Sequence, residues 1–213
     1  MDDKEKTLEA ILSAAPVVPV LTIDDRAIAV PLARALVAGG LTAREVTLRT
    51  PAGLDCIRAI AGEVEGANAG AGTVLDARQY EAAAKAGATF VVSPGATPAL
   101  LAAAAVSFVP FLPGVATAGE AMMLADAGYK FLKFFPAEPA GGIAYLKALS
   151  APLPGLRFCP TGGISVKNAA AYLALANVIC VGGSWIAPAE SLASGDWAKV
   201  TALAREASRI TGA

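Results

Sequence analysis

Lys133 lies between apolar neighbours in one aromatic-rich segment of this chain. The run from Tyr129 to Pro136 reads Tyr-Lys-Phe-Leu-Lys-Phe-Phe-Pro. Side chains of an extended strand alternate between its faces, so Phe131, Lys133 and Phe135 share one face. An amine kept out of water favours its neutral form, and a neutral amine attacks ketones. The alternative interpretation is structural: Lys133 lies at a strand end and pairs with a carboxylate.

A second segment, Glu45-Val-Thr-Leu-Arg49, carries opposite charges on one face. The same alternation places Glu45, Thr47 and Arg49 together. An arginine at a strand end can hold a carboxylate bidentately, and a carboxylate deeper inside can move protons. The alternative is that Glu45 and Arg49 form only a structural ion pair.

Glycines lie within or just after the carboxyl ends of three predicted strands. Gly70-Ala-Gly-Thr73-Val74 offers bare backbone beside one hydroxyl. Thr161-Gly-Gly-Ile164 and Gly182-Gly-Ser-Trp185 each precede a predicted helical region. Backbone amides at helix N-termini suit a phosphate, so the two glycine pairs indicate an anion site. The alternative is that tight turns need these glycines for conformation alone.

The chain contains no histidine, which excludes histidine-dependent triads and the usual histidine-rich metal sites. Its three cysteines, Cys56, Cys159 and Cys180, are widely spaced and show no metal-ligand pattern, so we expect reduced thiols. We therefore expect neither a metal nor another cofactor. Proton transfer must fall to carboxylate, lysine, tyrosine or water.

Short apolar runs alternate with helical patterns along the chain, after a first amphipathic helix at 4–15 that is expected to close one end of the fold. Eight strands, each followed by a helix, predict a single α/β domain over residues 1–213, a closed (β/α)8 TIM barrel. The fold alternative is a flavodoxin-like open sheet, which normally has about five strands. The predicted strands are 17–21, 45–49, 67–74, 89–92, 108–112, 131–135, 156–160 and 178–181.

Barrel enzymes place their chemistry at the carboxyl ends of the strands, which is where Arg49 and the glycine pairs fall. The glycine pairs follow strands seven and eight, a frequent phosphate position in barrels.

Composition limits the partners. Hydrophobic residues make up 55% of the 213 positions, charged residues 16%, and the net charge is -1. This gives no electrostatic footprint for nucleic acid or a membrane surface. The apolar composition indicates that much surface is hidden in a core, in subunit contacts or in both, and we expect an oligomer. The uncharged stretches 86–119 and 168–189 are broken by proline and glycine, so neither is expected to span a bilayer. The mixed-charge start lacks a secretory signal pattern, so we expect a cytoplasmic protein.

Together these motifs resemble the class I aldolases of 2-keto-3-deoxy-6-phosphogluconate (KDPG) and 2-keto-4-hydroxyglutarate (KHG). The most specific part is the lysine strand combined with the Glu-Val-Thr-Leu-Arg strand. The resemblance implies a metal-independent lyase that cleaves KDPG to pyruvate and glyceraldehyde 3-phosphate in the Entner-Doudoroff pathway, also acts on KHG, and assembles as a homotrimer. It covers nearly the whole chain through the segments 45–50, 70–74, 93–95, 133–138, 158–164 and 182–185.

The resemblance also implies a role for each site residue. Lys133 would form the Schiff base with the substrate's C2 carbonyl, and Glu45 would carry protons through water. The pyruvate portion and its carboxylate would contact Arg49, Thr73, Pro94 and Phe135. The phosphate would bind at Thr161, Gly162, Gly163, Gly183 and Ser184.

Three alternatives remain open at the level of sequence. An aldolase for 2-keto-3-deoxy-6-phosphogalactonate, the C4 epimer, would use the same lysine. A phosphate-binding barrel isomerase would explain the glycine pairs but gives Lys133 no covalent role. A non-catalytic phosphosugar-binding subunit would leave the proton-transfer residues unexplained.

Overall fold

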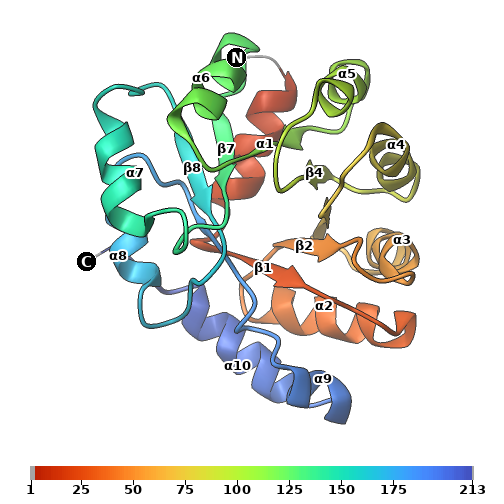
Figure 1. The fold of residues 1–213 in the computed structure, drawn as a ribbon. Coiled ribbons are helices and arrows are strands. Elements are labelled where there is room, and N and C mark those ends of the chain that lie inside the picture. Colours follow the sequence, from red (N-terminus) through yellow and green to blue (C-terminus); the bar gives the residue numbers. More distant parts are fainter. Residues whose placement is uncertain (1–2, 213) are drawn as a thin grey trace.

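The computed structural model describes residues 3–212. Strands and helices alternate along the chain, and the strands form a curled parallel layer surrounded by helices (Figure 1). The strand order is β5-β4-β3-β2-β1-β9 in one sheet and β6-β7-β8 in the other. The strands are β1 (Val17–Leu21), β2 (Ala43–Thr47), β3 (Asn68–Gly72), β4 (Phe90–Val92), β5 (Phe111–Leu112), β6 (Gly114–Val115), β7 (Phe131–Phe134), β8 (Arg157–Pro160) and β9 (Val181–Gly183).

Polar residues just after the strands begin several of the helices. The side chains of Asp76, Thr97 and Thr117 each accept a hydrogen bond from a backbone amide in the first turn of their helix. Each helix therefore starts soon after its strand. The helices are α1 (Asp3–Ser13), η1 (Arg26–Ile28), α2 (Ala29–Ala38), α3 (Gly53–Glu63), α4 (Ala77–Lys85), α5 (Pro98–Val106), α6 (Ala118–Asp126), α7 (Gly142–Ser150), α8 (Ala169–Leu173), α9 (Ala189–Ser194) and α10 (Trp197–Ala207).

The two sheets are linked at both sides. Isolated parallel bridges join Phe158 to Val178 and Thr161 to Gly182, next to β8 and β9. On the other side, only Pro113 separates β5 from β6. The structure therefore has the α/β class and the parallel, curled sheet that the sequence predicts.

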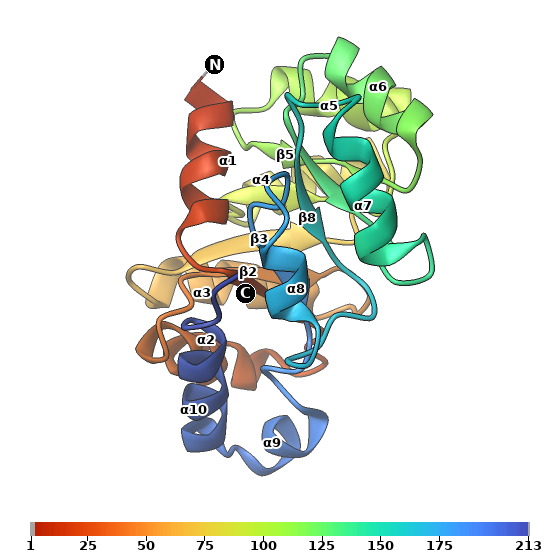
Figure 2. The same ribbon diagram turned by 90° about the vertical axis from the view of Figure 1, so that its left-hand side faces the viewer.

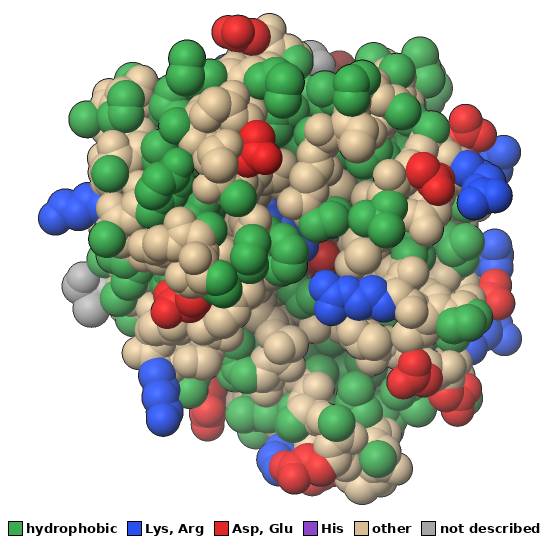
Figure 3. All heavy atoms as spheres, in the orientation of Figure 1, with side chains coloured by type: hydrophobic (Ala, Val, Ile, Leu, Met, Phe, Trp, Pro, Cys, Tyr) green, Lys and Arg blue, Asp and Glu red, His purple; other side chains and the backbone are tan. Residues whose placement is uncertain are grey.

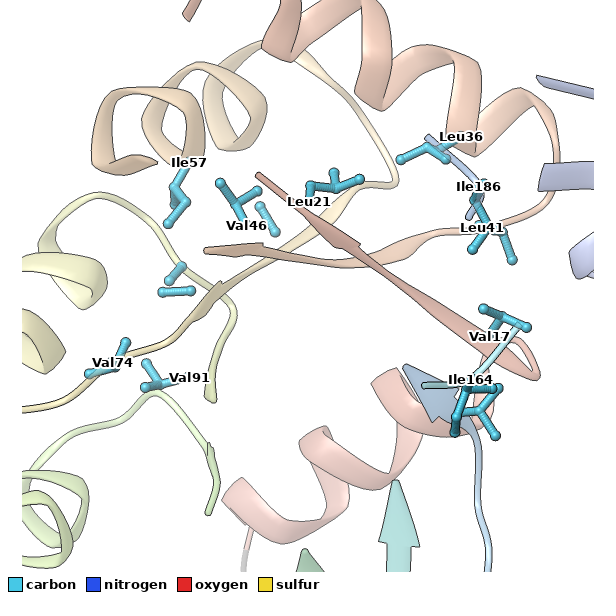
Figure 4. Close-up of a cluster of buried hydrophobic side chains, with 14 of the residues drawn as sticks. Val17, Leu21, Leu36, Leu41, Val46, Ile57, Val74, Val91, Ile164 and Ile186 are labelled. Atoms are coloured by element: carbon cyan, nitrogen blue, oxygen red, sulfur yellow. The ribbon is translucent and has the colours of Figure 1, made fainter. Parts of the chain in front are cut away.

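Two apolar layers follow from the alternation of side chains along the strands. The outer layer lies between strands and helices, where Leu21 and Val46 lie near Ile57 of α3 (Figure 4). The inner layer fills the curled sheet with Val18, Phe90 and Phe131, and α1 adds Leu8, Ile11 and Leu12 to it. Helix α1 lies across one end of the curled sheet, on the side away from the face seen in Figure 1 (Figure 2). The first helix covers one end of the fold, as expected.

Four predicted strands have boundaries that are wrong by two residues or more. The third ends at Gly72 instead of Val74. The second strand spans Ala43–Thr47 instead of 45–49, so Arg49 lies two residues beyond its end. The last strand spans Val181–Gly183 instead of 178–181. The fifth strand begins at Phe111, and Phe108 is 98% exposed, because Val109 donates its amide to the hydroxyl of Ser107 in a local turn.

Among the described helices, none has both the length and the apolar character needed to cross a bilayer.

Candidate active site

Lys133 and Glu45 contact each other inside the curled sheet. The Nζ atom of Lys133 lies 3.0 Å from Oε1 and 3.2 Å from Oε2 of Glu45. Lys133 is 3% exposed and Glu45 is 4% exposed. Nζ also lies 5.3 Å from the centre of the Phe135 ring, which is a cation–π distance. The lysine is therefore out of bulk water and in direct contact with a proton acceptor.

A glycine in β3 makes room for this carboxylate. A Cβ atom at Gly72 would lie 2.2 Å from Oε1 of Glu45, and one at Gly70 would lie 2.3 Å from the Phe90 ring. Both glycines were expected to leave bare backbone for a ligand. Instead they accommodate side chains from the two neighbouring strands. A side chain at position 72 of β3 would force Glu45 away from Lys133.

Arg49 and Thr73 meet where β2 and β3 end. Arg49 donates from Nε to Oγ1 of Thr73 over 3.2 Å. Thr73 has a φ of 57°, a left-handed conformation that costs a β-branched residue energy. The proposed ion pair between Glu45 and Arg49 is wrong, because Glu45 pairs with Lys133 instead. Arg49 is exposed, so its guanidinium is open to an anion from solvent.

Pro94 and Phe135 follow β4 and β7. A Cβ at Gly114 would lie 2.3 Å from the carbonyl carbon of Pro94, so the chain after β4 runs tightly against β6. Gly114 is in turn the β6 partner of Lys133. Pro94 therefore lies one strand away from the amine, and Phe135 lies directly beside it.

The two glycine turns lie side by side, because Thr161 is bridged to Gly182. Thr161 is buried, with its side chain against Gly182, whereas Gly163 and Ser184 are exposed. Gly162 and Gly163 have φ values of 102° and 80°, which favour glycine. Within residues 3–212, the amides of these two glycines donate to no protein acceptor. The structure thus brings the five predicted phosphate residues together, and two of them, Gly162 and Gly163, have free amides.

The face of the molecule seen in Figure 1 is hollowed near its middle (Figure 3). Basic and acidic side-chain atoms appear at depth in this hollow, and its surroundings are mostly apolar or uncharged.

Reasoning from the sequence missed a second polar pair, Glu138 with Tyr172. The hydroxyl of Tyr172 on α8 donates to Oε1 of Glu138, which follows β7. Burial and, next, the hydrogen bond to Glu138 raise the pKa of Tyr172. The only signal in the sequence was the segment Pro-Ala-Glu138 after the lysine strand, and nothing pointed to Tyr172.

A buried arginine was missed as well. Arg44 is fully buried in β2 and donates from Nη2 to the carbonyl oxygens of Leu41 and Thr42 over 2.9 and 2.8 Å. Its Nε and Nη1 find no partner in the described part of the chain. Burial lowers the pKa of Arg44 to about 10. The strand prediction began one residue later and so did not include it.

A buried amine in contact with a carboxylate, within a curled parallel sheet and beside free turn amides, is the architecture of an enzyme that forms imines with ketones. A family model described as "KDPG and KHG aldolase" matches residues 8–203. The chain therefore belongs to the KDPG and KHG aldolase family, and the expected family and lyase class are confirmed.

Individual relatives agree with this assignment. The 2-dehydro-3-deoxy-phosphogluconate aldolase of Pseudomonas aeruginosa is 52% identical over 97% of this chain and 94% of its own. A KDPG aldolase of Legionella pneumophila, solved with pyruvate as a covalent carbinolamine, matches with a TM-score of 0.92 and 46% identity over 94% of this chain and 97% of its own. The Zymomonas mobilis ZM4 enzyme, solved with 3-phosphoglycerate, matches with a TM-score of 0.93 and 47% identity over 98% of both chains.

Proposed function

We propose that this chain is a class I aldolase that cleaves KDPG to pyruvate and glyceraldehyde 3-phosphate through a Schiff base on Lys133. The observation that carries the proposal is the contact of 3.0 Å between Nζ of Lys133 and Glu45, both of them buried. Membership of the aldolase family and the pyruvate carbinolamine in the Legionella pneumophila enzyme support it.

The pair performs the first half of the reaction. Glu45 takes a proton from the Lys133 ammonium, and the neutral amine then attacks C2 of the keto acid. The former carbonyl oxygen is protonated and leaves as water. The product is an iminium ion at C2, which can accept an electron pair.

Glu45 also serves the bond-breaking half. It removes the proton of the C4 hydroxyl through a water, so that C4 becomes the aldehyde carbon of glyceraldehyde 3-phosphate. The electrons of the C3–C4 bond move into the iminium and give an enamine. Protonation at C3 and hydrolysis of the imine then release pyruvate and restore the amine.

Arg49 and Thr73 bind the carboxylate of the pyruvate portion. Their mutual hydrogen bond orients the guanidinium at the ends of two adjacent strands, and a guanidinium binds carboxylates bidentately. Pro94 and Phe135 pack around the keto acid near the amine.

The phosphate binds at the paired turns, where Thr161, Gly162, Gly163, Gly183 and Ser184 lie together. Free amides in left-handed glycine turns form a concave anion site. The 3-phosphoglycerate in the Zymomonas mobilis enzyme supports a phosphorylated substrate.

The strands form an eight-stranded (β/α)8 barrel in one domain, in which β5 and β6 count as one strand interrupted at Pro113. The bridges beside β8 and β9 support this closure. The protein acts in the cytoplasm and needs no metal or other cofactor for this chemistry.

The protein assembles as a homotrimer. Support comes from large apolar side chains that are exposed near one another in the chain, on α5, α6 and the loop between α5 and β5: Val106, Phe108, Met122 and Met123. Such exposure is unusual for a monomer and suits contacts between copies. A second copy of this chain would cover the side chains.

KHG is a second substrate, and the family description names both keto acids. The galactonate-derived epimer of KDPG is the competing substrate, because it would use the same amine. An isomerase or a non-catalytic binding subunit is disfavoured by the buried Lys133–Glu45 pair.

Pyruvate release from KDPG and from its C4 epimer, followed with lactate dehydrogenase, tests the proposed substrate. We expect a higher kcat/KM for KDPG. Equal values would mean that the enzyme does not discriminate at C4, and a higher value for the epimer would assign the galactonate-derived substrate.

A further inference from the structure

The side chain of Glu138 lies directly against the glycine turn that follows β8. A Cβ atom at Gly163 would lie 2.6 Å from Cγ and 2.7 Å from Cβ of Glu138. Only a bare backbone can approach the carboxylate's stem this closely. The position of Glu138 therefore limits where the backbone of Gly163 can lie.

Backbone hydrogen bonds tie the same two segments together. Ala137 donates its amide to the carbonyl oxygen of Thr161 over 2.8 Å, and Glu138 donates to that of Gly162 over 3.0 Å. These bonds extend the pairing of β7 with β8 past the ends of both strands. The carbonyl groups of the turn are thus held on the side of β7, while the amides of Gly162 and Gly163 remain free.

Helix α8 holds the turn from the other side. Asn168, at the N-terminus of α8, donates from Nδ2 to the carbonyl oxygen of Gly163 over 3.2 Å. One turn later, the buried hydroxyl of Tyr172 reaches back to the carboxylate of Glu138. The hydrogen bond between Tyr172 and Glu138 therefore links α8 to the segment after β7, with the glycine turn between them. We call this pair of residues the bracket.

Neither residue of this bracket is used in the reaction steps given above. Tyr172 is 0% exposed, so its hydroxyl is not available to a substrate in solvent. Glu138 itself is exposed, but the buried hydroxyl of Tyr172 would lose its acceptor if the carboxylate moved away, and that cost favours the Glu138 rotamer that keeps the hydrogen bond. Glu138 and Tyr172 thus affect the site by holding the glycine turn in place and take no part in the reaction steps.

From this arrangement we infer that Glu138 and Tyr172 are positioning residues of the phosphate site. They hold the Gly162–Gly163 backbone in the conformation whose free amides receive the phosphate. The inference rests on the proposed phosphate site. It predicts that loss of the bracket weakens phosphate recognition and leaves the chemistry at Lys133 intact.

Three variants test the bracket. Tyr172→Phe and Glu138→Ala each remove the hydrogen bond, whereas Glu138→Gln keeps an oxygen that accepts it. Tyr80→Phe is the matched control, because Tyr80 is also buried and donates from its hydroxyl to the carbonyl oxygen of Val109 over 2.7 Å, away from the glycine turn. Thermal unfolding confirms that each variant is folded.

Two measurements separate the phosphate site from the amine. The first is KM and kcat for KDPG. The second is the rate at which borohydride traps pyruvate, which carries no phosphate, on Lys133. In Tyr172→Phe and Glu138→Ala we expect KM for KDPG to rise about three- to tenfold, as for the loss of one well-placed hydrogen bond. The kcat and the trapping rate should stay within about twofold of wild type, as should all values for Glu138→Gln and Tyr80→Phe.

An unchanged KM in both bracket variants overturns the inference. So does a trapping rate that falls in parallel with kcat/KM, because general loosening of the fold would then explain the effect. Failure of the proposed function gives a different result, since wild type itself would neither trap pyruvate nor release it from KDPG.

Discussion

Gly72 on β3 lacks a side chain at the place that the carboxylate of Glu45 occupies. A methyl group there would lie 2.2 Å from Oε1 of Glu45 and 2.3 Å from its Cγ. Glu45 is in turn 3.0 Å from the amine of Lys133. The contact between Glu45 on β2 and Lys133 on β7 therefore depends on β3 having a glycine, which has no Cβ, at position 72.

Replacing Gly72 with alanine should displace the carboxylate and leave the amine without its proton acceptor. We expect kcat to fall about 100-fold, the lower end of what a general acid–base residue contributes. Steady-state cleavage of KDPG measures this. Gly62→Ala is the matched control, because a Cβ at Gly62 meets nothing within 4 Å, and its kcat should equal that of wild type. Full activity in Gly72→Ala would show that the position of Glu45 is not critical.

Arg49→Ala should weaken binding of the substrate carboxylate. Charge-assisted hydrogen bonds to a carboxylate contribute about 1.5–3 kcal/mol, so we expect half-saturation by pyruvate in borohydride trapping to rise roughly 10- to 100-fold. Arg58→Ala is the control, since Arg58 is exposed on α3 and pairs there with Asp55. If the pyruvate concentration for half-saturation were the same in both variants, Arg49 would not be a residue that binds the substrate carboxylate.

Leu12 of α1 is buried in the inner apolar layer. Leu12→Ala should lower the free energy of unfolding by about 2–5 kcal/mol, because it removes buried methyl groups and leaves a cavity. Leu75→Ala, at an exposed leucine, should lower it by less than about 0.5 kcal/mol. Urea unfolding compares the two variants. Equal stabilities would mean that α1 does not close the end of the sheet.

The buried thiol of Cys56 makes the free energy of unfolding depend on pH in the alkaline range. Burial, followed by the charges of Asp55 and Asp25, raises the pKa of Cys56 from 9.0 to about 11. The thiol of the unfolded chain loses its proton first, so this contribution to stability is present below pH 9 and is lost as the pH rises to about 11. Wild type should lose stability more steeply than Cys56→Ala across this window. If the free energies of unfolding of the two proteins, measured with urea, fell in parallel across this pH range, the raised pKa of Cys56 would be contradicted.

Residues close in sequence were the predictable part of this site. Strand alternation placed Lys133 on one face with Phe135, and it grouped Glu45 with the inward side of β2, because both inferences need only the period of a strand. The family resemblance then assigned the roles. The first helix, predicted at 4–15 from its apolar spacing, spans Asp3–Ser13.

Contacts between distant segments were not predictable. The partner of Lys133 lies 88 residues away, and the space that Gly72 leaves for Glu45 exists only after β2 and β3 pair. The left-handed backbone of Thr73 carries no mark in a single sequence. Tyr172 reads as an ordinary core residue until α8 brings it to Glu138.

The covalent role of Lys133 is tested most directly by incubating the protein with pyruvate and borohydride and mapping the adduct by peptide mass spectrometry. We expect one reduced pyruvate adduct, on Lys133, with Lys130 three residues away unmodified, and no adduct in Lys133→Ala. A wild-type protein that traps no pyruvate, or an adduct on another lysine with Lys133 unmodified, would contradict that role.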